Sequence, residues 1–434
     1  MNKIGIRKEE KAFEARTPII PAHVKQLNQN HGIEFIVEPS DLRVFDETLY
    51  LEAGAEMGLL DGEEPKVILG IKEMPEDFFQ SGKVYLFFSH TIKGQTHNMP
   101  MLTRILDEGA TLLDYELIVD DEGRRLVYFG NWAGMAGISD TFRVLGKRLE
   151  LENIQPNPFH GMKPTLQSRG VSGIETEFGT LAKRIQEDGL PKELTPFVVG
   201  FAGYGNVSRG AQRIFDILPH EVISPDDLPS LPAKTDVLYK CVFKEKDMAA
   251  PNDDNAEFEL QDYYTHGLEK YHGIFHEHAK YLTVLMNCIY WSPKYPRLLT
   301  KNFIENQWSK TKHKIIVIGD ISCDIEGAIE FTVKCTKPDK PAFTYNTAAK
   351  TADLGISTNG PVIMAVDNLP CELPIESSTS FSETLLDFVP LLATTDFTVD
   401  FNKLNLCREL KDAIIVYQGS LTDPYTHLNK YLNR

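Results

Sequence analysis

The sequence is poor in cysteine, tryptophan and positive charge, and it has no long hydrophobic run. Its six cysteines form no C-x-x-C pair, so the sequence predicts neither a zinc site nor a disulfide framework, and it suits a reducing compartment. Lysine and arginine number 45 against 62 acidic residues. The net charge of −17 argues against nucleic acid or an anionic membrane as a partner. An anionic substrate is compatible with this balance, because it needs positive charge only within its own site.

The longest apolar runs, such as residues 314–319, are far shorter than the ~20 residues that span a bilayer. A first strand is expected almost at Met1, so we expect no signal peptide and a cytoplasmic location. A chain of 434 residues with 42% hydrophobic and 25% charged residues is typical of a soluble globular protein with two or three domains.

One stretch, Phe197 to Ala211, has the pattern of a nucleotide-binding turn. An apolar run leads into glycines at 203, 205 and 210, and apolar residues at helical spacing follow. A buried strand, a glycine turn and a helix suit a dinucleotide pyrophosphate, because the turn allows close approach and the helix N-terminus offers free N–H groups. Ser208 stands where the third glycine of G-x-G-x-x-G belongs, so the signal alone is weak and an ordinary strand–helix turn is the alternative.

Short apolar runs alternate with amphipathic segments along the first third of the chain, which predicts an α/β domain with a parallel sheet. Expected strands are 3–7, 34–37, 67–70, 84–88 and 111–114, and expected helices are 21–28, 46–53 and 99–108. A packed helix is expected from Asn131 towards Glu152. From about Gly170 a second α/β unit is predicted, with buried parallel strands at 236–242, 283–289 and 315–321, a further run at 362–366, a helix at 382–392 and a polar end.

The predicted architecture is therefore two Rossmann-like α/β domains with parallel sheets and an active-site cleft between them. A polar insertion near 244–280 carries four histidines, His266, His272, His276 and His278. His272 and His276 could share a helix face and a metal ion, but no ligand motif accompanies them. We therefore interpret these histidines as solvated surface and predict no metal site.

Four polar residues of the first domain follow predicted strands: Arg16, Lys72, His90 and Glu116. A guanidinium can hold a substrate carboxylate bidentately, and a lysine or histidine in a cleft can exchange protons near neutral pH. Each position also has a plain explanation, since strand ends are often polar where they meet water. Acid–base groups beside a dinucleotide suggest hydride transfer coupled to proton transfer at an amine or a hydroxyl. In the second domain, Asp320 ends a strand, and Asp367 is either a cleft residue or a turn former.

Several motifs together resemble the alanine dehydrogenase/saccharopine dehydrogenase family, and most of all its branch of lysine-forming enzymes, the lysine-ketoglutarate reductases. The resemblance covers residues 3 to about 420, and its motifs are Glu14-Ala-Arg-Thr-Pro18, Ile71-Lys-Glu-Met-Pro75, Phe88-Ser-His-Thr-Ile-Lys93, Gly123-Arg-Arg125, Phe129-Gly-Asn-Trp-Ala-Gly-Met-Ala-Gly137, Asn287-Cys-Ile-Tyr-Trp291 and Asp367-Asn-Leu-Pro370. It implies a substrate domain of residues 1–135 and 370–434, with an NAD(P)-binding Rossmann domain of residues 136–369 inserted in it.

The resemblance also implies an oxidoreductase that condenses L-lysine with 2-oxoglutarate to saccharopine, or oxidises saccharopine. It implies acid–base roles for Lys72 at the amine nitrogen and His90 at imine hydration, and substrate binding by Arg16, Arg125, Glu73, Glu116 and Asp367. The expected cofactor-binding residues are Gly203, Gly205, Asn206, Val207, Gly210, Ser224 and Asp320. The second dehydrogenase domain of the bifunctional relatives is not expected in this chain.

NADP is favoured over NAD, because Glu221-Val-Ile-Ser224 ends the next strand without an acid at its tip to bind the ribose hydroxyls. Arg209 or a nearby cation would then meet a 2′-phosphate. Two alternatives to the lysine reaction stay open: an alanine-dehydrogenase-like amino acid dehydrogenase, and a non-catalytic NAD(P)-binding sensor. The oligomeric state and the physiological direction are left open.

Overall fold

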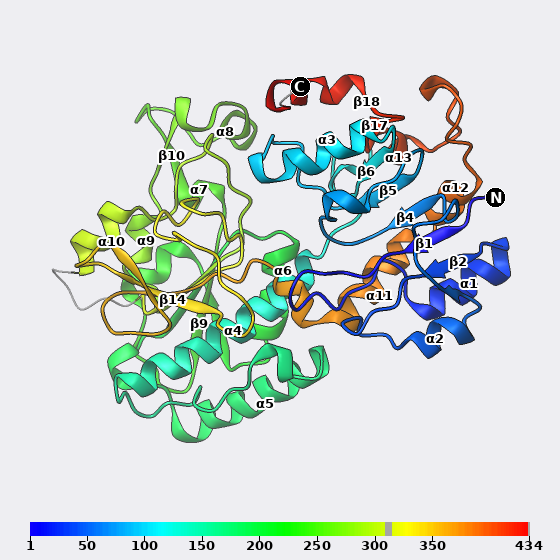
Figure 1. Cartoon of the computed structure of the whole chain (residues 1–434). Coiled ribbons are helices and arrows are strands. Elements are labelled where there is room, and N and C mark those ends of the chain that lie inside the picture. The colour runs from blue at the N-terminus through cyan, green and yellow to red at the C-terminus, as the bar shows by residue number, and fades with distance from the viewer. Residues whose placement is uncertain (309–314, 433–434) are drawn as a thin grey trace. The chain divides into compact units, whose positions relative to one another are not determined.

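A computed structural model describes residues 1–308 and 315–432. The chain divides into two compact units, Met1–Phe129 with Pro374–Arg434, and Gly130–Leu373. The second unit is thus inserted in the first (Figure 1). The boundaries predicted from the sequence are 135/136 and 369/370. No helix among the described residues is both long and apolar enough to cross a membrane.

The first unit contains an eight-stranded sheet in the order β18-β17-β6-β5-β4-β1-β2-β3. The strands are β1 (Ile4–Ile6), β2 (Phe35–Val37), β3 (Glu56–Met57), β4 (Val67–Leu69), β5 (Val84–Phe87), β6 (Thr111–Asp114), β17 (Ile414–Tyr417) and β18 (Ser420–Leu421). Strands β1 to β6 pair in parallel, and β17 pairs antiparallel with β6. The helices of this unit are α1 (Pro21–His31), α2 (Glu47–Glu52), α3 (Met99–Asp107), α11 (Pro374–Leu385), α12 (Val389–Thr394) and α13 (Arg408–Asp412).

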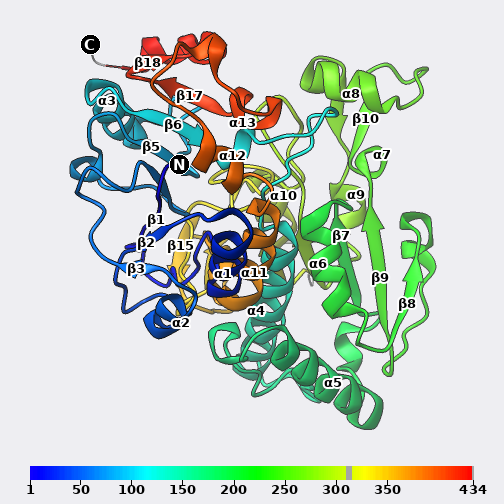
Figure 2. The ribbon, with the colours of Figure 1, turned by 90° about the vertical axis from the view of Figure 1, so that its right-hand side faces the viewer.

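The five strands and three helices expected in the first third are all present, and residues of β1, β4, β5 and β6 are buried. Two expectations near the C-terminus were wrong. The expected polar end contains β17, whose four apolar and aromatic residues are buried beside β6 (Figures 1 and 2). The expected helix 382–392 is two helices, because Pro390 occupies the first turn of α12, where its missing N–H costs no intrahelical bond.

The second unit has its own eight-stranded sheet, in the order β15-β14-β16-β13-β12-β7-β9-β8. Its strands are β7 (Val198–Ala202), β8 (His220–Ile223), β9 (Leu238–Phe243), β12 (Val284–Asn287), β13 (Val317–Asp320), β14 (Ala342–Asn346), β15 (Thr351–Leu354) and β16 (Val362–Met364). The neighbouring strands β8, β9, β7, β12, β13 and β16 pair in parallel in that order across the sheet. Strand β14 is antiparallel to both β15 and β16. Its helices are α4 (Gly130–Leu151), α5 (Val171–Asp188), α6 (Asn206–Phe215), α7 (Glu245–Met248), α8 (Leu260–His266), α9 (His276–Ala279) and α10 (Lys301–Trp308). Two mostly parallel sheets confirm the predicted α/β class.

The structure separates the two histidines of the insertion that could have shared a helix face. The insertion contains a two-stranded antiparallel hairpin of β10 (Ala249–Pro251) and β11 (Tyr271–Gly273). His272 lies on β11 and His276 opens α9, so the two histidines do not share a helix face. Within residues 1–308 and 315–432, no group of three or more histidine, cysteine or acidic residues is arranged to hold a metal ion.

Helices α4 and α6 touch through glycine (Figure 2). A Cβ atom added to Gly134 of α4 would lie 2.0 Å from the carbonyl oxygen of Val207, and one added to Gly210 of α6 would lie 2.1 Å from that of Asn131. Both obstacles are backbone atoms, so the helices could accept a side chain only by moving apart. The small residues that predicted a packed helix at 131–152 therefore serve a close helix–helix contact.

Candidate functional site

The first unit gathers three of the expected site residues at one edge of its sheet. Strands β4, β5 and β6 are neighbours and parallel, so their carboxyl ends meet at the same edge. Lys72 follows β4, His90 follows β5, and Glu116 follows β6. This is the edge at which ligands bind in open parallel sheets.

The loop that carries Lys72 is held by a residue that the sequence analysis missed. The carboxylate of Glu9, which follows β1, accepts hydrogen bonds from the backbone N–H of Ile71 at 2.6 Å and of Lys72 at 3.0 Å. Glu9 is only 5% exposed, and burial, with the charge of Glu14, raises its pKa to about 7. Glu9 follows β1 as Lys72 follows β4, and this position after a buried strand is the one sequence signal that could have identified Glu9.

The Lys72 ammonium is desolvated without a close partner. Among the described residues its side chain makes no ion pair within 4.0 Å and no hydrogen bond. Burial and the positive charge of Arg16 lower the pKa of Lys72, while Glu73 and Glu14 act in the opposite direction. A partly buried lysine with a lowered pKa gives up its proton more readily than an exposed one, which suits an acid–base role.

His90 forms an ion pair with the neighbour of Lys72. Its Nδ1 contacts Oε1 of Glu73, and its ring stacks on Phe88 with ring centres 6.3 Å apart. Burial alone would raise the pKa of Glu73, but the hydrogen bond and charge of His90 lower it to about 2. His90 has a φ of +49°, a left-handed conformation that non-glycine residues adopt rarely and that recurs at functional sites.

A pH experiment tests this pair. A carboxyl with a lowered pKa in the folded state contributes stability above its unfolded pKa of about 4.5, and this stability is lost as the pH falls towards 2. We expect Glu73→Gln to lose about 2 kcal/mol less stability than wild type between pH 5 and pH 3, measured by urea unfolding. Glu76→Gln, at an exposed neighbour, is the control and should follow wild type. Equal losses in Glu73→Gln and wild type would contradict the assignment.

Arg16 has a carboxylate partner within its own chain. Its Nε donates to Oε1 of Glu14 at 2.6 Å, and its Nη2 contacts Oε2 of the same residue. Both side chains are buried, and the guanidinium lies 4.1 Å from the ring centre of Phe129. The structure thus fixes the guanidinium of Arg16, but the two nitrogens that could hold a substrate carboxylate already contact the carboxylate of Glu14. The sequence did not predict this pairing.

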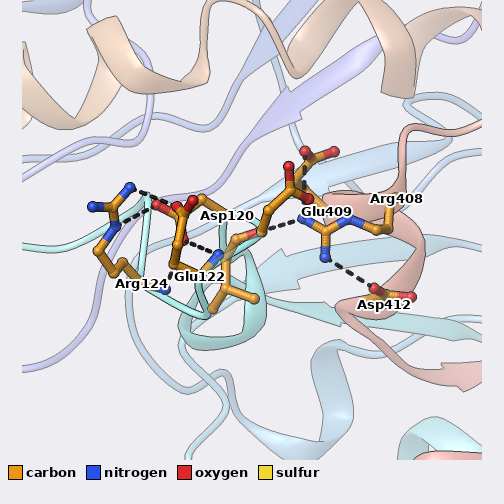
Figure 3. Close-up of polar contacts among 8 residues, drawn as sticks. Asp120, Glu122, Arg124, Arg408, Glu409 and Asp412 are labelled. Atoms are coloured by element: carbon orange, nitrogen blue, oxygen red, sulfur yellow. Dashed lines mark hydrogen bonds and ion pairs between the residues drawn. The ribbon is translucent and has the colours of Figure 1, made fainter.

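Arg125 and Glu116 form the other charged pair of this unit, with Nη1 and Oε1 3.1 Å apart. Arg125 is half-exposed and follows a turn that other charges hold (Figure 3). In that turn Arg124 contacts Asp120 and Glu122, both at 2.7 Å, and Arg408 of α13 contacts the neighbouring Asp121 at 2.9 Å. Arg124 is therefore used within the turn, and Arg125 is the arginine beside Glu116.

A buried aspartate joins the ends of β5 and β6. Asp114 accepts hydrogen bonds from the backbone N–H of Ser89 at 2.9 Å and of Glu116 at 2.8 Å. It is fully buried, and burial raises its pKa. Asp114 therefore ties the residue before His90 to Glu116 itself, a positioning role that the sequence analysis did not assign.

The second unit forms the predicted glycine turn. Strand β7 leads into Gly203 at φ +91°, and Gly205 precedes the first residue of α6, Asn206. No side chain caps α6, and a Cβ added at Gly205 would meet open space. The free N–H groups of the first turn, which includes Val207, and the open approach at Gly205 fit a pyrophosphate.

Gly210 and Ser208 have packing roles in this turn. Gly210 faces α4, as described above, and Ser208 is fully buried and accepts a hydrogen bond from Gln212 at 2.8 Å. Ser208 therefore occupies the place of the third fingerprint glycine without obstructing the turn. Gly210 therefore contributes to the position of α6 by allowing it to pack closely on α4.

The strand order changes which residue lies beside the turn. Strand β9, and not β8, is the neighbour of β7, so Ser224 at the tip of β8 is one strand further away. The hydroxyl and N–H of Ser224 both donate hydrogen bonds to the carboxylate of Asp227, at 2.7 and 2.8 Å.

The tip of β9 carries the exposed Lys244, followed by Glu245. The carboxylate of Glu245 accepts hydrogen bonds from the hydroxyls of Tyr264 at 2.6 Å and Tyr204 at 3.2 Å. Glu245, Tyr204 and Tyr264 line a cavity of about 390 Å³ that also borders Gly203 and Gly205.

Asp320 and Asp367 end strands of the same sheet. Asp320 is buried and accepts hydrogen bonds from Asn287 at 2.8 Å and Thr332 at 2.5 Å, and burial raises its pKa to about 6. Asp320 thus holds neighbouring chain segments in place. Asp367 follows β16, is exposed, and its backbone N–H bonds the carbonyl of Thr336 at 3.3 Å.

Comparisons with known proteins agree with this geometry. The family model "Alanine dehydrogenase/PNT, N-terminal domain" matches residues 5–136, and "Alanine dehydrogenase/PNT, C-terminal domain" matches residues 268–424. The chain is similar in fold to an L-alanine dehydrogenase, with a TM-score of 0.59 and 15% identity over 99% of this chain and 98% of the other. A transhydrogenase from Sinorhizobium meliloti has a TM-score of 0.56 and 14% identity over 98% of this chain and 99% of the other.

Relatives in sequence are more specific. An alpha-aminoadipic semialdehyde synthase of Arabidopsis thaliana is 36% identical, and the match covers 96% of this chain and 40% of that protein. A mitochondrial alpha-aminoadipic semialdehyde synthase of Bos taurus is 33% identical, and the match covers 98% of this chain and 47% of that protein. The chain therefore spans less than half the length of these relatives. A saccharopine dehydrogenase [NAD(+), L-lysine-forming] of Emericella nidulans is 28% identical over 89% of this chain and 90% of its own.

Fold and site together define a two-unit α/β protein with a glycine turn in the inserted unit and the titratable residues Lys72, His90 and Glu116 at one sheet edge of the other. The chain belongs to the alanine dehydrogenase/PNT family, and its sequence relatives there are alpha-aminoadipic semialdehyde synthases and saccharopine dehydrogenases.

Proposed function

We propose that the chain is an NAD(P)-dependent oxidoreductase acting on a secondary amine, which joins L-lysine and 2-oxoglutarate to give saccharopine and water, or catalyses the reverse. The observation that carries the proposal is the desolvated Lys72 ammonium beside the Glu73–His90 pair, at one sheet edge. The relatives named for saccharopine and aminoadipic semialdehyde support the choice of substrates.

In this reaction the nicotinamide supplies or accepts the hydride, and the residues of this chain manage protons and charge. Lys72 exchanges a proton with the substrate amine, since burial and the charge of Arg16 lower its pKa and make the proton easier to transfer. His90 serves the hydration or collapse of the imine, and its contact with Glu73 sets the ring orientation. Arg125 offers a half-exposed cation for a substrate carboxylate, and Arg16 offers a buried one that its pairing with Glu14 partly neutralises.

The proposal is tested by NADPH and NADH consumption at neutral pH with 2-oxoglutarate, with and without L-lysine. We expect oxidation that depends on lysine. Consumption with pyruvate and ammonia but not with lysine would replace the proposal by an alanine-dehydrogenase-like reaction. Cofactor binding without turnover on any amine would favour the sensor.

We further propose NADP as the preferred cofactor. The support is Lys244, an exposed cation at the tip of the strand next to the glycine turn, with no ion pair of its ammonium among residues 1–308 and 315–432. The carboxylate that follows it, Glu245, is engaged by two tyrosine hydroxyls and so competes less for ribose hydroxyls. The relatives at 25–28% identity are named for NAD(+), which keeps NAD as the second candidate.

The cofactor proposal predicts a selective defect. Lys244→Gln should raise the KM for NADPH about tenfold and leave that for NADH nearly unchanged, because only NADPH carries the 2′-phosphate. Lys246→Gln, an exposed lysine on α7, is the matched control. A similar loss with both cofactors, or none with either, would reject Lys244 as the phosphate ligand.

A further inference from the structure

A cavity of about 740 Å³ in the second unit lies away from the glycine turn and contains an excess of positive charge. It is bordered by α4, by the segment before β14 and by the end of β15. Its lining includes five cations and a single carboxylate: Arg143, Lys147, Lys334, Lys337, Lys340 and Asp339. In a chain with a net charge of −17, such a concentration of cations requires an explanation.

Arg143 is the central feature of this cavity. It is 9% exposed, and its Nε has no hydrogen-bond partner. Among residues 1–308 and 315–432 its guanidinium forms no ion pair within 4.0 Å and no hydrogen bond. A buried guanidinium without a partner is costly, and an anion in the cavity would remove that cost.

Two buried acids interact with Arg143 but form no ion pair with it within 4.0 Å among the described residues. Asp140, one turn earlier on α4, and Glu372 interact electrostatically with Arg143 and with each other. Burial raises the pKa of both carboxyls, and the charge of Asp140 raises that of Glu372 further.

The four lysines of the cavity also lack ion-pair partners among the described residues. Lys334 lies 5.2 Å from the ring centre of Phe343. Burial and the charge of Arg143 lower the pKa of Lys147, which shows that the cations repel one another in the absence of a ligand.

We propose that this cavity is a second ligand site, which binds a small anion with two or more negative charges, either phosphate or carboxylate. Arg143 would contact the anion from the base of the cavity, and Lys334, Lys337 and Lys340 would surround it. The residues that line it differ from those of the glycine turn and of the Lys72 edge.

Binding is measured by calorimetry with inorganic pyrophosphate and with citrate, on protein with and without saturating NADPH, which occupies the glycine turn. We expect one equivalent of anion to bind in the presence of NADPH and to weaken steeply with added salt. Pyrophosphate and citrate separate a preference for phosphate from one for carboxylate.

Variants decide whether the binding belongs to this cavity. The double variant Lys337→Gln, Lys340→Gln changes two exposed residues and should weaken binding about tenfold, and Arg143→Gln should weaken it at least as much. The double variant Lys183→Gln, Lys192→Gln removes two exposed lysines elsewhere in the same unit and should bind like wild type. Wild type without binding, or equal weakening in both double variants, would overturn the proposal. Turnover with lysine should persist in Lys337→Gln, Lys340→Gln, which separates this site from the proposed function.

Discussion

Lys72→Met is expected to abolish lysine-dependent oxidation of NADPH, lowering kcat by roughly 10²- to 10⁴-fold. Methionine fills a similar volume but cannot exchange a proton. The desolvation that lowers the pKa of Lys72 favours an apolar side chain at this position, so the variant should fold. The measurement is kcat at saturating substrates, together with the melting temperature of the variant.

Two comparisons make the Lys72 result specific. Lys25→Met, on the exposed face of α1, should keep wild-type kcat. Direct binding of NADPH to Lys72→Met should also be unchanged, because the glycine turn lies in the other unit. Near-normal turnover in Lys72→Met would remove Lys72 from the catalytic residues and make His90 the first candidate to replace it.

Gly134→Ala should destabilise the second unit by about 3 kcal/mol or more, although alanine is the better helix former. The new Cβ would lie 2.0 Å from the carbonyl oxygen of Val207 and 2.6 Å from the backbone nitrogen of Ala211. Neither atom can rotate away, so α4 and α6 must separate. We expect a lower midpoint in urea unfolding and weaker NADPH binding, because the first turn of α6 belongs to the proposed cofactor site.

The same substitution at Gly179 is the matched control. Gly179 lies within α5, and a Cβ added there meets no atom within 4 Å. Gly179→Ala should therefore stabilise the protein by up to about 1 kcal/mol through helix propensity alone. If both variants shifted stability in the same direction, the contact between α4 and α6 would be looser than the structure indicates.

Sequence patterns were sufficient where a single local feature determined the outcome. The apolar runs predicted the buried strands, and the residues after them, Lys72, His90 and Glu116, lie at one sheet edge because parallel neighbours end together. The alternation of strands and helices likewise predicted both sheets. The roles of these residues in binding and catalysis remain predictions.

Pairings between distant residues were not predictable in the same way. No local sequence pattern predicts that the carboxylate of Glu9 bonds the backbone of the loop that carries Lys72, or that the carboxylate of Glu14 pairs with the guanidinium of Arg16. The insertion of β9 between β7 and β8 is a property of the whole sheet, and because of it Lys244, and not Ser224, follows the strand next to β7. Strand β17 was missed because four apolar residues in a polar tail are a weak signal until β6 provides a partner.

The insertion of one unit within the other has a consequence for synthesis on the ribosome. All strands and helices of the second unit lie between residues 130 and 373, so this unit can fold as soon as that segment has emerged. The first unit cannot close its sheet until β17 is made, and β6 remains an open edge while more than half of the chain is translated. We therefore expect the inserted unit to fold first and the nascent first unit to be the part that needs chaperone protection.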